Sequence, residues 1–392
     1  MSDVTASCRS SRTIVRLLAL AAVLALAAAA CASDGGDEAG GVGATDTGTA
    51  SEAGSATGDD AESSETPATQ DESNDDDARN QDDDEAGGQD GEGDGDFPVT
   101  LEQQIGSVTI PAEPERIFVL DDWSFDYLTA LGVQPIGATL FTPPSSWVSG
   151  PVVEATPITQ LAAELPLEAI AAENPDLLID AGGFHTWDPD MAERLKAIAP
   201  TLSPVTGAEV DSWQTTLRHI AAAVGRSNEG EAQITQTTEQ IAQVVADNPE
   251  IAGARLTIAR WNPLNSTYAM ISSPDDVVRQ FLNGQLGFVT PQAQLDAIES
   301  GGAELLGQTL EVSEEEFDLA GDGADVIIMS VTGGDPAPLL ENPIWQSQDF
   351  VADGRVVYVD EEAIIALIAP SPRSIGFVLD TVVPEVVAVL NG

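Results

Sequence analysis

The sequence contains few basic, sulfur-containing or catalytic-type polar residues. Its 392 residues include 14 Lys+Arg against 66 Asp+Glu, for a formal net charge of −52. Nucleic-acid binding requires a cationic face, so this balance excludes it. The two cysteines, Cys8 and Cys31, and the two histidines, His185 and His219, are too few for a zinc finger, an iron–sulfur centre or a disulfide framework. We therefore expect neither zinc nor redox chemistry.

Motifs of the common catalytic classes are also absent. The sequence has no G-x-S-x-G, no G-x-x-x-x-G-K and no H-E-x-x-H. Its one lysine, Lys196, lies on a polar helix face, which is the ordinary place for a solvated charge. Acidic residues are abundant, but no pair stands out as a catalytic pair. These absences favour a binding protein without a cofactor over an enzyme.

The N-terminus has the features of an export signal. Three arginines in the first sixteen residues precede an apolar run at 17–30, which is shorter than the roughly 20 residues that span a bilayer. Residues 1–30 are therefore predicted to be a signal peptide. The run ending Ala-Ala-Ala-Cys31 resembles a bacterial lipobox, except that Ala28 stands where Leu is preferred. We predict that Cys31 is lipidated; the alternative is an ordinary cleaved signal with Cys31 incidental.

Residues 31–96 have the composition of a disordered tether. From 32 to 96 the sequence has 22 acidic residues, one base and no aromatic residue. Such a segment cannot bury enough apolar surface to offset the entropy of ordering it, and its charges repel one another. We expect it to hold a folded module away from the membrane.

Residues 97–392 show the alternation of strands and helices that is typical of an α/β domain with a mainly parallel sheet. The longest helical pattern runs from 229 to 249 and, at 1.5 Å per residue, spans roughly 30 Å. The alternation resumes after it. We therefore predict two Rossmann-like lobes, 97–228 and 250–392, joined by one long bridging helix, with a ligand cleft between them.

An internal repetition supports this division. In the first lobe a glutamate, Glu168, precedes an apolar helix residue, an aspartate-led strand and the pair Gly182-Gly183. The same order recurs in the second lobe from Glu315 to Gly333-Gly334. Glu168 and Glu315 would then occupy equivalent edges of the two lobes.

Aromatic residues make up only 5% of the chain and gather after predicted strand ends. In open α/β sheets, ligands bind beyond the carboxyl ends of the strands. The candidates for lining such a cleft are Trp123, Trp147, Trp187, Trp261 and Tyr268. The alternative is that each aromatic side chain packs locally between the lobes, and we prefer that reading for Phe125, Tyr127 and Phe141.

Three further polar side chains are candidates for the cleft. Arg260 ends a predicted strand and Arg373 lies in a proline-rich loop, where a guanidinium can bind ligand oxygens or serve as a surface charge. His185 is a candidate contact, although a histidine satisfied within its loop is the commoner case.

Several segments resemble one known family in their order along the chain. They are Ile110–Val119, Leu131–Gly137, Pro175–Ile179, Asn342–Trp345 and Gly354–Asp360. In these segments the module resembles the iron-siderophore (Fe/B12-type, class III) ABC-transporter substrate-binding proteins. The resemblance implies two α/β lobes on one rigid helix and capture of a ferric siderophore in the interlobe cleft.

The resemblance also implies the partners and the location. A monomeric lipoprotein on the outer face of the cell membrane would deliver its ligand to an ABC permease and its ATPase. Family members dock through one glutamate per lobe, which here would be Glu168 and Glu315. Glu314 and Glu316 flank Glu315, so either neighbour is an alternative for that position.

Three alternatives to a siderophore receptor stay open. Cobalamin would suit an aromatic cleft, and haem would need an axial ligand such as Tyr127, Tyr268 or His185. A different class of function is an extracellular hydrolase that uses acids of the cleft.

Overall fold

The computed structural model describes residues 97–392 apart from five short segments, 162–163, 207–210, 272–276, 301–303 and 307–308. The described residues belong to one compact unit. The predicted signal peptide, Cys31 and the acidic tether lie outside the described residues.

The N-terminal lobe contains a parallel five-stranded sheet in the order β5-β4-β3-β6-β7. Its central strands β3 and β6 are buried along their whole length, as expected of parallel strands covered on both faces. A separate hairpin, β1 and β2, precedes the sheet. The strands are β1 (Val99–Leu101), β2 (Val108–Ile110), β3 (Ile117–Val119), β4 (Gly137–Leu140), β5 (Ile158–Gln160), β6 (Leu177–Ile179) and β7 (Thr201–Leu202). The helices are α2 (Asp122–Ala130), α3 (Pro151–Ala155), α4 (Leu167–Ala172), α5 (Pro189–Lys196) and α6 (Trp213–Ala223).

The C-terminal lobe contains a mixed six-stranded sheet in the order β10-β11-β9-β8-β12-β13. Strands β8, β12 and β13 are parallel, whereas β9, β10 and β11 extend the sheet in antiparallel fashion. The strands are β8 (Leu256–Asn262), β9 (Thr267–Ile271), β10 (Glu304–Leu306), β11 (Thr309–Ser313), β12 (Val326–Val331) and β13 (Val356–Val359). The short connections between β8 and β9 and between β10 and β11 allow only antiparallel pairing, so this half departs from the mainly parallel pattern that the sequence predicts.

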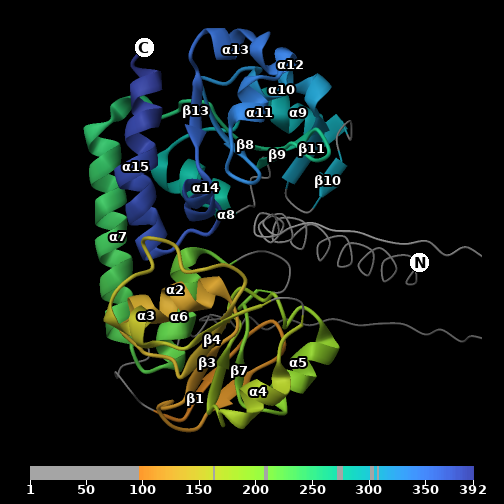
Figure 1. Ribbon diagram of the computed structural model, residues 1–392. Coiled ribbons are helices and arrows are strands. Elements are labelled where there is room, and N and C mark those ends of the chain that lie inside the picture. The colour runs from red at the N-terminus through yellow and green to blue at the C-terminus, as the bar shows by residue number, and fades with distance from the viewer. Residues whose placement is uncertain (1–96, 162–163, 207–210, 272–276, 301–303, 307–308) are drawn as a thin grey trace, which may run out of the picture. The chain divides into compact units, whose positions relative to one another are not determined.

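Short helices surround this second sheet (Figure 1). They are α8 (Val277–Phe281), α9 (Gln292–Ser300), α10 (Asp318–Gly321), α11 (Ala337–Leu340), α12 (Pro343–Gln346), α13 (Asp349–Ala352) and α14 (Glu361–Ile368), with α15 (Pro372–Leu390) at the C-terminus. The described residues also form two short 3₁₀ helices, η2 (Pro249–Ile251) and η4 (Glu314–Glu316), and one turn of π-helix, η3 (Leu282–Leu286).

One long helix, α7 (Ser227–Asp247), links the two lobes at the place where the sequence predicts a bridging helix. Its buried residues Gly230, Ile234, Thr237 and Ile241 recur at three- and four-residue intervals and form one apolar face. A Cβ at Gly230 would lie 2.7 Å from Ala221 Cβ, so the glycine permits the close approach of α6 to α7.

A second junction joins the lobes beside α7. The C-terminal helix α15 runs alongside α7 (Figure 1), and its first turn meets α2 of the N-terminal lobe. Tyr127 Oη donates a hydrogen bond of 2.7 Å to Pro370 O, and Ser371 Oγ donates one of 2.5 Å to Asp126 Oδ2. The largest hydrophobic cluster accordingly runs through both lobes and these two long helices.

Candidate functional site

A cavity of about 270 Å³ lies between the lobes. The N-terminal lobe contributes segments that follow the carboxyl ends of β3, β4 and β6, and the C-terminal lobe contributes β8, α8 and α14. This is the edge of the sheet at which α/β folds bind ligands. The lining includes Trp123, Phe141, Trp147, Phe184 and Trp187 from the first lobe and Ile258, Arg260, Glu361, Ile364, Ile365 and Ile368 from the second.

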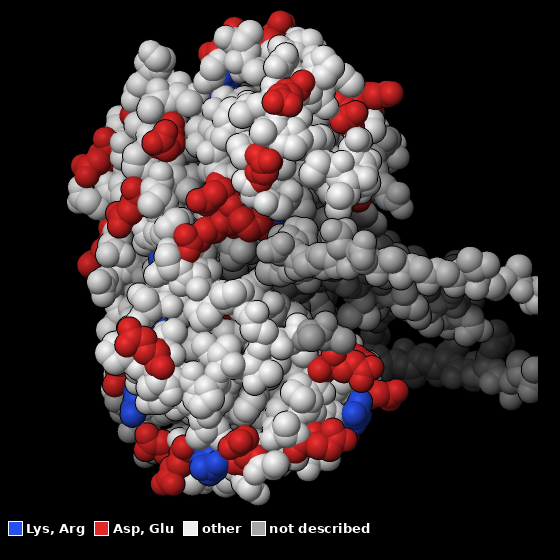
Figure 2. Space-filling view, in the orientation of Figure 1, with Lys and Arg blue, Asp and Glu red and all other residues white. Residues whose placement is uncertain are grey.

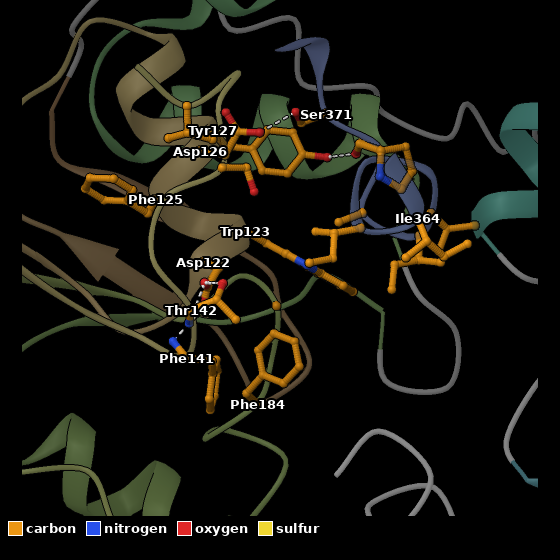
Figure 3. A pocket seen from close by; sticks show the side chains of 18 of the residues that line it. Asp122, Trp123, Phe125, Asp126, Tyr127, Phe141, Thr142, Phe184, Ile364 and Ser371 are labelled. Atoms are coloured by element: carbon orange, nitrogen blue, oxygen red, sulfur yellow. Dashed lines mark hydrogen bonds between the residues drawn. The ribbon is translucent and has the colours of Figure 1, made fainter. Parts of the chain in front are cut away.

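One wall of the cavity is an aromatic cluster. The ring of Phe184 meets those of Trp123 and Phe141 edge-to-face, with centroids 5.2 Å apart in each case. Trp187 lies 6.1 Å from Phe184 on the other side. In Figure 3, Trp123 extends from α2 into the space between Phe184 and Ile364 of the opposite lobe. The rings are only partly buried, so their faces remain available to a ligand.

Local backbone geometry explains why the loop after β6 can present these rings. Gly183 has a φ of +76°, a conformation that L side chains rarely adopt. A Cβ there would lie 2.7 Å from Trp187 Nε1 and 2.8 Å from Pro204 Cγ. The glycine thus lets the backbone pass directly beneath Trp187.

Two buried aspartates hold α2 and this loop together beneath the cavity. Asp121 accepts hydrogen bonds from Ser124 N at 2.8 Å and Ser124 Oγ at 2.6 Å, which caps α2 two residues before Trp123. Asp180 accepts from Thr186 N at 2.7 Å, Thr186 Oγ1 at 2.8 Å and His185 N at 3.1 Å.

The two carboxyl groups lie close enough for their charges to interact. Burial, and to a smaller extent the neighbouring Asp180 charge, raise the pKa of Asp121 to about 7. Burial likewise raises the pKa of Asp180 to about 7, although its hydrogen bonds oppose the change. Two adjacent buried carboxyl groups are best satisfied when they share one proton, because like charges at this distance repel.

A third aspartate, Asp122, fixes the segment after β4. It accepts hydrogen bonds from Phe141 N at 2.8 Å, Thr142 N at 3.1 Å and Thr142 Oγ1 at 2.7 Å (Figure 3). Burial raises the pKa of its carboxyl group, and these hydrogen bonds limit the shift. Asp122 therefore positions the Phe141 backbone at the edge of the cavity.

Asp126 lines the cavity at the junction of α2 and α15. Its carboxyl group receives the Ser371 hydroxyl and lies 3.7 Å from Arg373 Nη1. Burial raises its pKa, and hydrogen bonds from Ser371 and Trp147 together with the Arg373 charge oppose that rise. These contacts tie a cavity wall to the interlobe junction.

The charged pair of the cavity is Arg260 at the end of β8 and Glu361 at the start of α14. Arg260 Nη2 donates to Glu361 Oε1, and both side chains are largely screened from solvent. Arg260 Nε and Glu361 Oε2 are buried and have no hydrogen-bond partner among the described residues. Both atoms are screened from solvent, so the pair meets a ligand as a neutralised charge rather than through these two atoms.

Four of the predicted ligand-contacting residues line the cavity, namely Trp123, Trp147, Trp187 and Arg260. Trp123, Trp147 and Trp187 are partly exposed, whereas the other tryptophans, Trp213, Trp261 and Trp345, are buried in hydrophobic clusters.

Trp261 and Tyr268 do not line the cavity, contrary to expectation. They face each other across β8 and β9 within a separate hydrophobic cluster of the C-terminal lobe. Successive residues of a strand point to opposite faces, so Arg260 points to the cavity and Trp261 away from it. The Tyr268 hydroxyl donates to the carbonyl of Glu316.

His185 and Arg373 are also structural. The His185 ring stacks behind Phe141 with centroids 5.8 Å apart, its Nε2 lies 3.0 Å from Leu120 O, and burial lowers its pKa. Arg373 donates from Nη1 to Thr129 Oγ1 at 3.0 Å and from Nη2 to Thr129 O at 2.9 Å, and thus stabilises the end of α2.

Sequence reasoning missed Glu361 and undervalued Phe141. Glu361 begins a helix directly after a strand, the same placement that singled out the tryptophans. It was missed because acidic residues are so common in this chain that one more carries no signal.

The two predicted docking glutamates lie on the surface. Glu168 is exposed in the first turn of α4, and Glu315 is exposed in η4. The neighbours of Glu315 are engaged: Glu314 accepts from Asn342 Nδ2 at 3.0 Å, and Glu316 accepts from Ser313 Oγ at 3.4 Å. Their role in docking stays a prediction.

The described residues contain neither a metal-ligand cluster nor a membrane-spanning helix. No group of three or more His, Cys, Asp or Glu side chains in this part of the chain is arranged to hold a metal ion. No helix among the same residues is both long and apolar enough to cross a bilayer.

Comparisons with known proteins place these features in context. The family model for periplasmic binding proteins matches residues 117–363. A probable siderophore-binding lipoprotein of Bacillus subtilis is 25% identical over 257 residues, which cover 64% of this chain and 73% of that protein. The iron(3+)-hydroxamate-binding protein FhuD of the same organism is 23% identical, over 67% of this chain and 78% of that protein.

Solved structures share the fold. A periplasmic solute-binding protein from Mycobacterium smegmatis superposes with a TM-score of 0.62 at 25% identity, over 74% of this chain and 98% of its own. The iron-uptake substrate-binding protein PiaA from Streptococcus pneumoniae superposes with a TM-score of 0.59 at 21% identity, over 75% of this chain and 99% of its own.

Proposed function

Because the chain belongs to the periplasmic binding protein family, whose model matches more than half of it, we propose that it is the solute receptor of an ABC importer. In this proposal it captures a ferric siderophore outside the cell and delivers it to a membrane permease and its ATPase. The observation that carries the proposal is the partly exposed aromatic cluster in the interlobe cavity. The siderophore-binding relatives support an iron chelate as the cargo.

The side chains that could serve as an axial ligand of haem are engaged in other contacts, which argues against haem as the ligand. The Tyr127 and Tyr268 hydroxyls each donate to a backbone carbonyl, and His185 is held behind Phe141. Burial also raises the pKa of both tyrosines, which opposes the phenolate that would bind iron. A chelate whose iron is already fully coordinated needs no such ligand from the protein.

The acids of the cavity support a receptor rather than a hydrolase. Asp122 accepts three hydrogen bonds from the segment after β4, Asp126 is bound to the interlobe junction, and Glu361 is paired with Arg260. A hydrolase needs one acid free to protonate a leaving group and another to activate water or attack. Asp211, the fourth acid of the lining, accepts a hydrogen bond of 2.6 Å from Val205 N. Each acid is therefore engaged in holding another part of the module.

Delivery would use the surface acids of both lobes. We expect Glu168 and Glu315 to meet basic residues of the permease, while lipidated Cys31 and the acidic tether hold the monomeric receptor at the outer face of the membrane. Reversal of both glutamates to Lys should abolish iron uptake in cells and leave chelate affinity unchanged. The control is the same reversal at Glu239 and Glu385, two exposed acids on α7 and α15. Lost affinity in the first variant would assign Glu168 and Glu315 to the ligand site or the fold.

Tryptophan fluorescence tests the proposal directly, because three of the six tryptophans line the cavity. Ferric hydroxamates, ferric catecholates, haem and cobalamin are titrated into the purified protein, with controls for ligand absorbance. Saturable quenching by a ferric chelate, recovered unchanged, is the expected result. The variant Trp123→Phe should lose part of the quenching, whereas Trp261→Phe should keep all of it. Binding of cobalamin or haem alone, or consumption of the ligand, would overturn the proposal.

A further inference from the structure

The cavity has very little positive charge. Four acids line it, Asp122, Asp126, Asp211 and Glu361, against one base, Arg260. Every other described Lys or Arg lies outside the lining. The segments of 97–392 that the structure leaves undescribed contain no Lys or Arg in their sequence. No other basic residue of the module can therefore compensate an anionic ligand in this cavity.

The one base is already neutralised. Arg260 is paired with Glu361, so the charges of the pair cancel. The unpartnered atoms Arg260 Nε and Glu361 Oε2 are buried, so they are not open to a ligand. A ligand without net charge therefore meets no uncompensated charge at the pair.

The surroundings reinforce this preference. The acid excess of the chain gives a negative field, and Figure 2 shows acidic side chains over both lobes with few basic ones between them. Such a field attracts cations and repels anions. An anion would also lose its hydration in a largely aromatic and aliphatic cavity without gaining a counter-ion, and this loss is costly. Aromatic faces such as those of Trp123 and Trp187 attract cationic groups instead.

Ferric siderophores differ in charge according to their chelating groups. Three hydroxamates, each singly charged, balance Fe³⁺ and leave a neutral core, and their backbones carry amides or amines. Three catecholates, each doubly charged, leave the chelate triply negative. Ferric chelates of α-hydroxycarboxylates are likewise anionic.

We propose that the cavity selects neutral or positively charged ferric trihydroxamates over catecholate and α-hydroxycarboxylate chelates, because the Arg260–Glu361 pair neutralises the one base of its lining. This inference rests on the proposed function and specifies its ligand. It replaces the expectation that Arg260 binds an anionic oxygen, because Glu361 already occupies that role.

Calorimetric titration at two salt concentrations tests the inference. The probes are a neutral cyclic ferric trihydroxamate, a cationic linear one, a ferric triscatecholate and ferric citrate. We expect both trihydroxamates to bind at least about a hundredfold more tightly than the anionic chelates, with the cationic chelate weakened by salt. Preference for an anionic chelate would overturn this inference and leave the proposed function standing. If no ferric chelate bound, both would fail.

Variants of the charged pair supply a second readout. Glu361→Gln leaves Arg260 unpaired, and we expect the ratio of catecholate to trihydroxamate affinity to rise by about tenfold or more. Glu385→Gln makes the same charge change on the exposed face of α15 and should leave the ratio unchanged. The double variant Arg260→Gln/Glu361→Gln, which keeps the pair's net charge, should keep the preference for trihydroxamates. An unchanged ratio in Glu361→Gln, in a protein that unfolds at the wild-type temperature, would contradict the role of the pair.

Discussion

Substitution of Asp121 by Asn tests the shared proton beneath the cavity. The Asp121 and Asp180 carboxyl groups are fully buried and close enough for their charges to interact, and burial raises the pKa of each to about 7. An Asn side chain has nearly the same shape and can donate an N–H to Asp180. The variant therefore keeps the contact but removes the proton that the wild-type pair must bind.

The sign of the effect follows from the direction of the shift. In the unfolded chain both groups titrate near the ordinary value of 3.8, so the folded state holds a proton that the unfolded state has released. The contribution of that proton to stability is fully present below pH 4 and is lost as the pH rises through about 7. Between pH 5 and pH 7 the loss amounts to about 3 kcal/mol at 1.36 kcal/mol per pH unit.

Urea unfolding at pH 5 and pH 8 measures this loss. We expect the free energy of unfolding of the wild type to fall by about 3 kcal/mol more than that of Asp121→Asn across this interval. Charge repulsion from the acidic surface, and the other titrating groups, contribute to both proteins alike and cancel in the difference. Equal pH dependence of the two proteins would show that the pair does not share a proton.

Three further substitutions test the construction of the site. Gly183→Ala should lower stability by about 1–3 kcal/mol and weaken ligand binding, because the new Cβ strains the backbone and displaces Trp187; Gly376→Ala, with open space around its Cβ, should not destabilise α15. Tyr268→Phe removes the hydroxyl that donates to the Glu316 carbonyl, so thermal unfolding should show a loss of about 1–2 kcal/mol with ligand affinity unchanged. Reduced affinity would show that Tyr268 contributes to the ligand site. Arg373→Met removes two hydrogen bonds at the end of α2 and should cost about 1–3 kcal/mol in urea unfolding; a variant as stable as wild type would show that these bonds do not stabilise the junction.

Much of the architecture could be predicted from the sequence because it depends on local patterns. The linking helix α7 contains no proline, and Pro249 follows its C-cap. Its existence and length can therefore be predicted from the sequence. The antiparallel half of the second sheet was not predicted, because a strand pattern does not specify which neighbour it will pair with.

The sequence by itself determined the α/β class, the two lobes and the placement of Trp123, Trp147 and Trp187 after strand ends, since strand and helix periods and turn residues act over short range. Only the tertiary structure decided which side chains face the cavity. Arg260 and Trp261 are neighbours in the chain, yet they point to opposite faces of β8, and the pairing of the sheet decides which face is which.

The charge of the cavity was likewise decided by tertiary contacts. Arg260 looked like an anion-binding residue until the fold brought Glu361 to it across 101 positions of sequence. The buried pair of Asp121 and Asp180 arises in the same way, from the meeting of two parallel strand ends. Such contacts depend on distances between remote segments, and these are set by the packing of the whole module rather than by any local pattern.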